Sequence, residues 1–216
     1  MIRQFHNLLR ADDGRPANRA ASCRLWHCLL SVTALMRILV LIIGIIAAVQ
    51  PALAQDETVY DYQVKAAFLV NFPKYVDWPS VAVRQGSPIT VAVFGDDNVA
   101  DAFAAMIGDR RTIEGHPLVL KRISREDEIS GGNFQVLFIA ASERSRIPAI
   151  LERIRGTSIL TVGETDDFLD QGGTINLVHR SRKIRLQVNL DAAKQANLKI
   201  SSRLLVAADT VKGTAN

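Results

Sequence analysis

The chain has 216 residues, of which 48% are hydrophobic and 22% charged, and its formal net charge is +4. Six arginines and two aspartates lie in residues 1–54, so the remaining residues carry 20 basic and 20 acidic side chains. The basic character therefore belongs to the N-terminal segment. A nucleic-acid-binding domain, which needs a basic surface, is not indicated.

The N-terminal segment has the pattern of a secretory signal peptide. Arg37 precedes the uncharged apolar run 38–49, and the small-residue sequence 52–54 predicts cleavage after Ala54. The run is shorter than the roughly 20 apolar residues that span a bilayer. We therefore expect residues 1–54 to be a cleaved leader of an exported protein, with translation starting at Met36. A retained anchor would have to bury Arg37 and is the less favoured alternative.

Both cysteines, Cys23 and Cys28, lie in this leader. Their spacing has no accompanying cluster of histidines or further cysteines, so a zinc site is not indicated. The sequence predicts a mature protein, residues 55–216, that forms one domain without a disulfide, a metal or a cofactor.

The first predicted element of the mature chain is an amphipathic helix over residues 64–79. Pro73 should kink this helix and Pro79 should end it, while Lys65 is expected on the face away from the core. Trp78, at the exit turn, is expected to be exposed enough for contact with a partner. The apolar residues at helical spacing are Val64, Ala67, Phe68, Phe72, Tyr75 and Val76.

Next come alternating strands and helices. Residues 89–94 and 135–140 are continuous apolar runs, which are typical of strands covered on both faces. Further strands are predicted at 116–123 and 158–162, and helices at 99–106 and 146–155, the first capped by Asp96-Asp97-Asn98. This order predicts an α/β fold, a three-layer Rossmann-like sandwich with a mostly parallel sheet.

The C-terminal third should differ from this pattern. Residues 174–178 and 184–188 flank a hairpin loop and are expected to form an antiparallel edge to the sheet. Helices are predicted at 190–197 and 203–209, the second capped by Ser201 and Ser202.

Signatures of enzymes are weak. Gly95 stands alone after the first strand, so no glycine-rich phosphate loop is formed, and the sequence has no G-x-S-x-G elbow. Asp96 and Asp97 lack a third carboxylate at the end of the next buried strand and are better explained as a helix cap. His116 and His179 have no nucleophile or metal-ligand neighbour in sequence. We therefore predict a protein that is not an enzyme.

Two interpretations remain open for residues 161–208. In the first, the glycines serve turn geometry, Asn189 caps a helix and Arg185 is an outward charge. In the second, the strand end at Gly163-Glu164 and the hairpin form a concave surface for a partner or a small ligand.

The segments K-A-A-F…F-P-K-Y-V-D-W-P and V-G-E…F…G-G-x-I-N…R-x-x-x-N-L-x-A-A-K-x-A-x-L-K-I-S-S-x-L-L together resemble the YfiR family of bacterial periplasmic proteins. The resemblance covers essentially all of the mature chain. It implies a Rossmann-like α/β sandwich, often dimeric, that holds the periplasmic sensor domain of an inner-membrane diguanylate cyclase in check. An outer-membrane lipoprotein partner aids release, which raises cyclic di-GMP and favours biofilm formation.

The functional prediction is a non-enzymatic periplasmic repressor of such a cyclase. The alternative is a small-ligand-binding module that serves a transporter or a sensor kinase, and a hydrolase with an unrecognised site is a weaker third option. The residues predicted to contribute to partner binding at the surface are Trp78, Glu164, Phe168, Ile175, Arg185 and Asn189.

Overall fold

The structure is a computed structural model that describes residues 61–109, 111–130, 132–181 and 183–213. These residues belong to one compact unit, Asp56–Asn216. The predicted leader, with Met36, both cysteines and the cleavage site after Ala54, lies outside the described residues.

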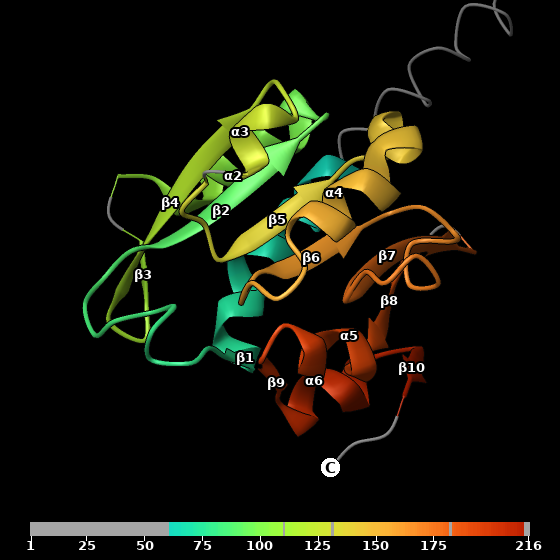
Figure 1. The fold of residues 1–216 in the computed structure, drawn as a ribbon. Helices are drawn as coiled ribbons and strands as arrows, with labels where there is room; N and C mark the ends of the chain where they lie inside the picture. The colour runs from blue at the N-terminus through green and yellow to red at the C-terminus, as the bar shows by residue number, and fades with distance from the viewer. Residues whose placement is uncertain (1–60, 110, 131, 182, 214–216) are drawn as a thin grey trace, which may run out of the picture. The chain divides into compact units, whose positions relative to one another are not determined.

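A mixed sheet organises the described part of the chain, with strand order β10-β8-β7-β6-β5-β2-β4-β3 (Figure 1). The pairs that join β7, β6, β5, β2 and β4 are all parallel, whereas β7–β8 and β3–β4 are antiparallel. The strands are β2 (Ile89–Phe94), β3 (Thr112–Ile113), β4 (His116–Ile123), β5 (Val136–Ile139), β6 (Leu160–Gly163), β7 (Ile175–Arg180), β8 (Lys183–Asn189) and β10 (Thr210–Lys212).

The central strands are apolar throughout because both of their faces are covered. Along β2, Val91 and Val93 belong to one buried cluster, while Ala92 and Phe94 belong to the other. Side chains of successive strand residues point to opposite faces, so a continuous apolar run supplies two cores at once.

Helices form the outer layers. Residues 61–71, α2, α5 and α6 pack on one face of the sheet, and α3 and α4 pack on the other. The helices are α2 (Asp97–Ile107), α3 (Asp127–Ser130), α4 (Ile147–Arg153), α5 (Leu190–Gln195) and α6 (Ser202–Ala207), and two 3₁₀ helices are η1 (Phe72–Tyr75) and η2 (Ala141–Arg146). The fold is therefore the three-layer α/β sandwich that the sequence predicts.

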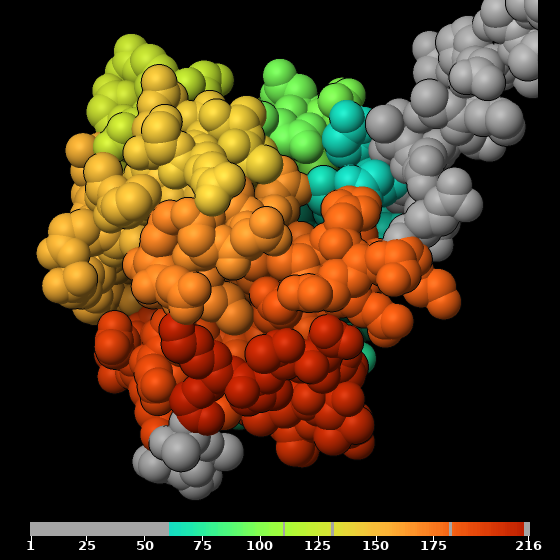
Figure 2. All heavy atoms as spheres, turned by 90° about the vertical axis from the view of Figure 1, so that its right-hand side faces the viewer, coloured from blue at the N-terminus to red at the C-terminus, as the bar shows by residue number. Residues whose placement is uncertain are grey.

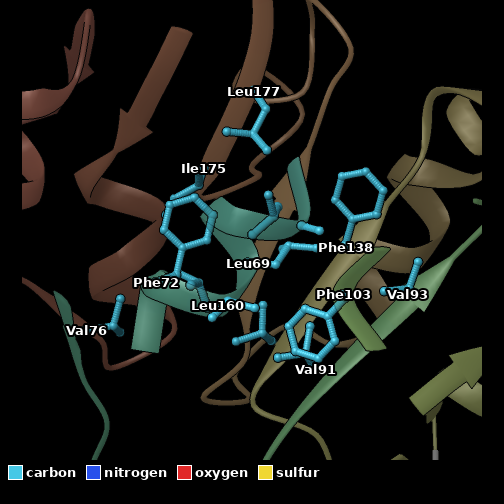
Figure 3. Packing of buried hydrophobic residues seen from close by; sticks show 14 of the residues in the cluster. Leu69, Phe72, Val76, Val91, Val93, Phe103, Phe138, Leu160, Ile175 and Leu177 are labelled. Carbon is cyan, nitrogen blue, oxygen red and sulfur yellow. The ribbon is translucent and has the colours of Figure 1, made fainter. Parts of the chain in front are cut away.

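The first helix supplies a large part of one core (Figure 3). Ala66, Leu69 and Val70 are buried, whereas Val64 and Phe68, which the sequence pattern assigned to the core, are only partly buried. The predicted buried face is thus displaced around the helix. Lys65, predicted to face outward, is buried against the carboxylates of Asp61 and Glu164.

Pro73 ends the α-helix instead of kinking it. Helical residues stop at Asn71, whose side-chain amide donates to the Ala67 carbonyl (2.7 Å), and the chain continues as η1 with Pro73 near its start. Proline lacks an N–H and cannot continue the i to i−4 ladder. Residues Val76–Asp77, predicted to be helical, form strand β1, which pairs with β9 (Lys199–Ile200) in a separate two-stranded sheet.

The predicted antiparallel hairpin is present as β7 and β8, but its position at the sheet edge is wrong. The three-residue strand β10 pairs in parallel beyond β8, and β3 lies at the opposite edge. Strands of two or three residues carry no recognisable hydrophobic pattern, which explains why the sequence did not reveal them. No helix within the described ranges is both long and apolar enough to cross a membrane.

Candidate functional site

The carboxyl ends of β2, β5 and β6 lie along one edge of the sheet, where α/β folds of this type bind their ligands. From β2 the chain runs to β4 on one side and then, after α3, to β5 on the other side of β2, so the switch point lies at Gly95. The hydroxyl of Ser142 donates to the Gly95 carbonyl (2.9 Å). A Cβ at Gly95 would lie 2.5 Å from Cγ of Glu143. Helix η2 therefore packs closely against Gly95 at this switch point.

Beside η2 lie four charged or titratable side chains, Asp61, Lys65, Glu164 and His179, here called the Lys65 network. The Lys65 ammonium lies 2.7 Å from Oδ2 of Asp61 and 2.6 Å from Oε2 of Glu164. Nε2 of His179 lies 2.7 Å from Oδ1 of Asp61. The other oxygen of Glu164 accepts from the Ala141 backbone N–H (2.6 Å) at the start of η2.

The network runs from solvent into the interior. Side-chain exposure falls from 56% for His179 to 18% for Asp61, and to 8% and 10% for Lys65 and Glu164. It joins the first helix, β7, the end of β6 and η2. The two halves of the sequence signature, around Lys65 and around Glu164, thus meet in one buried ion pair.

The positive charge of Lys65 is stabilised by its two carboxylate partners. Burial by itself would lower the pKa of Lys65, but its hydrogen bonds to Asp61 and Glu164, and their negative charges, outweigh burial and raise the pKa above its usual value. A protonated amine cannot act as a nucleophile or a general base. The network therefore holds the first helix, β7, the end of β6 and η2 together through charges.

The loop after Glu164 wraps around Phe168. The ring of Phe168 is fully buried and fills the space beside two glycines. A Cβ at Gly163 would lie 2.3 Å from a ring carbon, and one at Gly173 would lie 2.1 Å from another. Only glycine fits at these two positions, so the G-E…F…G-G pattern has a packing origin.

Two asparagines fasten the same loop. The Asn176 side-chain amide donates to the Thr165 carbonyl (2.8 Å), and that of Asn189 donates to the Leu169 carbonyl (3.0 Å). Oδ1 of Asn189 also accepts from two backbone N–H groups at the start of α5, each at 3.1 Å. Asn189 therefore caps α5, as the first interpretation of the sequence proposed.

The six residues predicted to contact a partner differ in their burial. Phe168, Ile175 and Asn189 are buried, so their prediction as surface side chains is wrong. They are held inside by the ring packing, the β7 core position and the helix cap. Arg185 is exposed on β8, and Trp78 is half-buried beside β1. Glu164 joins the Lys65 network, so the six residues do not form one patch.

Asp61, Lys65 and Asn176 organise this region but were not among the residues predicted from the sequence. The i,i+4 spacing of Asp61 and Lys65 was an available signal, because such a pair lies on one helix face. Glu164 could not be added to that pair from sequence, since it lies about a hundred residues away. Among the described residues no group of three or more His, Cys, Asp or Glu side chains could hold a metal ion.

The remaining candidates have structural positions. Asp96 caps α2, where its side chain accepts from the backbone N–H groups of Asn98 (2.9 Å) and Val99 (3.1 Å). Nδ1 of His116 lies 2.8 Å from the Ser87 carbonyl. The prediction of Asp96 as a helix cap is confirmed.

The fold and the Lys65 network define a three-layer α/β domain with a buried ion-pair network between its elements. Residues 62–209, well over half of the chain, match the family described as YfiR/HmsC-like. The chain belongs to the YfiR/HmsC-like family. That membership supports a periplasmic, regulatory role in diguanylate cyclase signalling in general.

Comparison with solved structures gives distant fold neighbours. A conserved domain protein from Vibrio cholerae overlaps with a TM-score of 0.41 and 13% identity, over 57% of this chain and 54% of its own. The ABC domain from Streptococcus pneumonia, solved in complex with L-Trp, overlaps with a TM-score of 0.46 and 10% identity, over 69% of this chain and 60% of its own. The chain thus spans between half and two thirds of these structures. No curated protein matches it.

Proposed function

We propose that this protein binds the periplasmic sensor domain of an inner-membrane diguanylate cyclase and represses it. The observation that carries the proposal is the family match over residues 62–209, which spans nearly all described residues. The predicted signal peptide, cleaved after Ala54, would deliver the protein to the same compartment as that sensor domain.

The mechanism is differential binding. A protein without catalytic chemistry changes the activity of a partner only by binding one of the partner's conformations more tightly than another. Here the inactive cyclase conformation is favoured, and capture by an outer-membrane lipoprotein removes the repression. A homodimer is part of the same proposal. Trp78 and Arg185 are the proposed contacts, and Glu164 contributes by holding the first helix in place.

Gene deletion in a strain that carries a cognate cyclase tests the proposal. We expect intracellular cyclic di-GMP to rise, and expression of the wild-type protein to restore the original level. A second strain, which lacks the genes of both this protein and the cyclase, is the matched control. Its cyclic di-GMP should not change when this protein is expressed. Unchanged cyclic di-GMP in the single deletion would contradict the proposal.

A cavity favours a second candidate function, the binding of a small molecule. A pocket of about 300 Å³ lies between α4 and α5, at the amino ends of β6 and β7. This volume is at the lower limit of ligand sites. Thr161 and Thr174 contribute to its lining together with Ile159 and Leu151, which suits a small amphipathic molecule. Screening such compounds for a rise in Tm, with Ala196→Trp as a filled-pocket control, would separate this function from partner binding alone.

A further inference from the structure

A smaller pocket of about 190 Å³ opens beside Trp78, at the end of the molecule where η1 passes into β1. This Trp78 pocket is lined by three separate segments: the η1–β1 exit, the loop that leads to β2, and the β3–β4 hairpin. Pro73, Val76, Val83 and Ile113 give it apolar walls.

The segments around the pocket are fixed to one another. Nδ1 of His116 on the hairpin lies 2.8 Å from the Ser87 carbonyl in the loop before β2. The hairpin turns through Glu114 (φ 50°) and Gly115 (φ 84°), between the paired residues Ile113 and His116. Two successive residues at positive φ are the geometry of a tight two-residue hairpin. The turn places Glu114 in the lining of the pocket.

The charge of the pocket is acidic and unbalanced. Asp77 and Glu114 both line it and are exposed, and no lysine or arginine is among the lining residues. Neither carboxylate forms an ion pair within the part of the chain that the structure describes. Lys199 lies opposite Asp77 in the β1–β9 strand pair, but the two side chains form no ion pair.

The size of the pocket selects the kind of occupant. Pockets for small ligands begin at about 300 Å³, so this one is too small for most metabolites and suits a single side chain. Carboxylates next to an indole and aliphatic walls complement a side chain with an apolar stem and a cationic head. Arginine fits better than lysine, because its planar guanidinium stacks on indole and can reach two carboxylates at once.

We propose that the Trp78 pocket receives an arginine side chain of a partner protein. The stem lies against Val76 and Ile113, and the guanidinium lies at the indole between Asp77 and Glu114. Buried arginine and tryptophan are the residues that most often dominate the affinity of an interface. The identity of the partner as a cyclase sensor domain rests on the proposed function, whereas the arginine-binding chemistry of the pocket does not.

The first test measures that chemistry directly. The ¹⁵N-labelled purified protein is titrated with N-acetyl-arginine methylamide and, in parallel, with the citrulline analogue, which has the same shape without the charge. The chain has two tryptophans, Trp26 and Trp78, so the Trp78 indole resonance is assigned with Trp78→Phe. We expect a saturable shift of this resonance with arginine, and an affinity about tenfold lower for citrulline.

The matched variants are D77N/E114Q and D166N/D209N, which remove the same charge from exposed carboxylates inside and outside the pocket. The first should bind arginine about tenfold more weakly, and the second should bind as the wild type does. Equal shifts with citrulline, equal binding by D77N/E114Q, or no saturable shift would each overturn the inference. Unchanged spectra elsewhere in D77N/E114Q show that the variant is folded.

The second test measures regulation. Where gene deletion raises cyclic di-GMP, D77N/E114Q should raise it several-fold toward the deletion level, and D166N/D209N should not. Normal repression by D77N/E114Q would overturn the pocket as the partner contact even if arginine binds. If the deletion itself has no effect, the proposed function fails, and the titration alone still decides whether the pocket binds arginine.

Discussion

At the scale of residues, Lys65 is a buried cation on a helix face that it shares with Asp61 and the apolar Leu69. It is tolerated there because Asp61 and Glu164 meet its ammonium at 2.7 and 2.6 Å. Leaving one partner of a buried ion pair unpaired costs much more than removing an exposed pair. Arg155 and Glu152, 2.5 Å apart and both exposed, provide an internal comparison.

We predict that Lys65→Met destabilises the protein by about 3 kcal/mol, because Asp61 and Glu164 then lose their buried cation. Arg155→Met is the control and should cost less than about 0.5 kcal/mol. Urea unfolding followed by circular dichroism gives both values. Similar midpoints for the two variants would show that the network contributes little to stability.

The raised pKa of Lys65 predicts a particular pH dependence. Because the folded-state pKa is above the unfolded value of about 10.4, the stabilisation is complete below that pH and is lost as the pH rises through the folded-state pKa. The difference in unfolding free energy between wild type and Lys65→Met should therefore be flat from about pH 8 to 10 and shrink above it. A difference that already shrinks below pH 10 would mean that the pKa is not raised.

At the scale of elements, the loop 164–174 owes its shape to Phe168 lying between Gly163 and Gly173. Gly173 is not among the glycines at positive φ, so an added methyl group there acts only through its clash with the ring. Its neighbour Gly172 has φ 101° and open space around its Cβ position. Substitution of Gly173 therefore tests the steric clash with the ring, and substitution of Gly172 tests backbone strain alone.

We predict that Gly173→Ala destabilises the protein by about 2–3 kcal/mol, and that Phe168→Ala relieves part of this cost in the double variant. Gly172→Ala should cost about 1 kcal/mol through backbone strain and be additive with Phe168→Ala. A double-mutant cycle by urea unfolding measures both couplings. Additivity for Gly173 and Phe168 would refute the ring-packing origin of the glycine pattern.

The same elements show why part of the candidate site could be predicted and part could not. Caps such as Asp96 and Asn189 depend on neighbouring backbone groups, so their residue type and position were sufficient to predict them. The burial of Phe168 and Ile175 depends on what lies across the sheet. Their prediction as surface residues failed because neither the loop position of Phe168 nor the strand position of Ile175 shows what packs against the side chain after folding.

At the scale of the whole molecule, β2 and β5 lie at the centre of the sheet with helices on both faces, whereas β10 and β3 are short edges. Figure 2 shows the C-terminal segment, in red, on the surface beside residues 150–175, in orange. Amides of central, doubly covered strands exchange only through global unfolding, and those of short edges exchange through local opening.

We predict that hydrogen exchange is slowest at Val91–Val93 and Leu137–Phe138 and fastest, among strand residues, at Thr210–Lys212. Amide exchange of the native protein followed by NMR would check this order. Protection of β10 equal to that of β2 would mean that the C-terminal strand is covered by another copy or a partner, and repeating the measurement after dilution would distinguish the two.

The sequence by itself determined the α/β class, the central strands and the main helices, because continuous or periodic apolar residues must be buried whatever surrounds them. Its two-part signature also predicted the YfiR family. The tertiary structure decided which helix face is buried, where the sheet ends and which residues are accessible. These depend on contacts between distant segments, such as Lys65 with Glu164 and Phe168 with Gly173, and no local pattern encodes the partner that a side chain meets after folding.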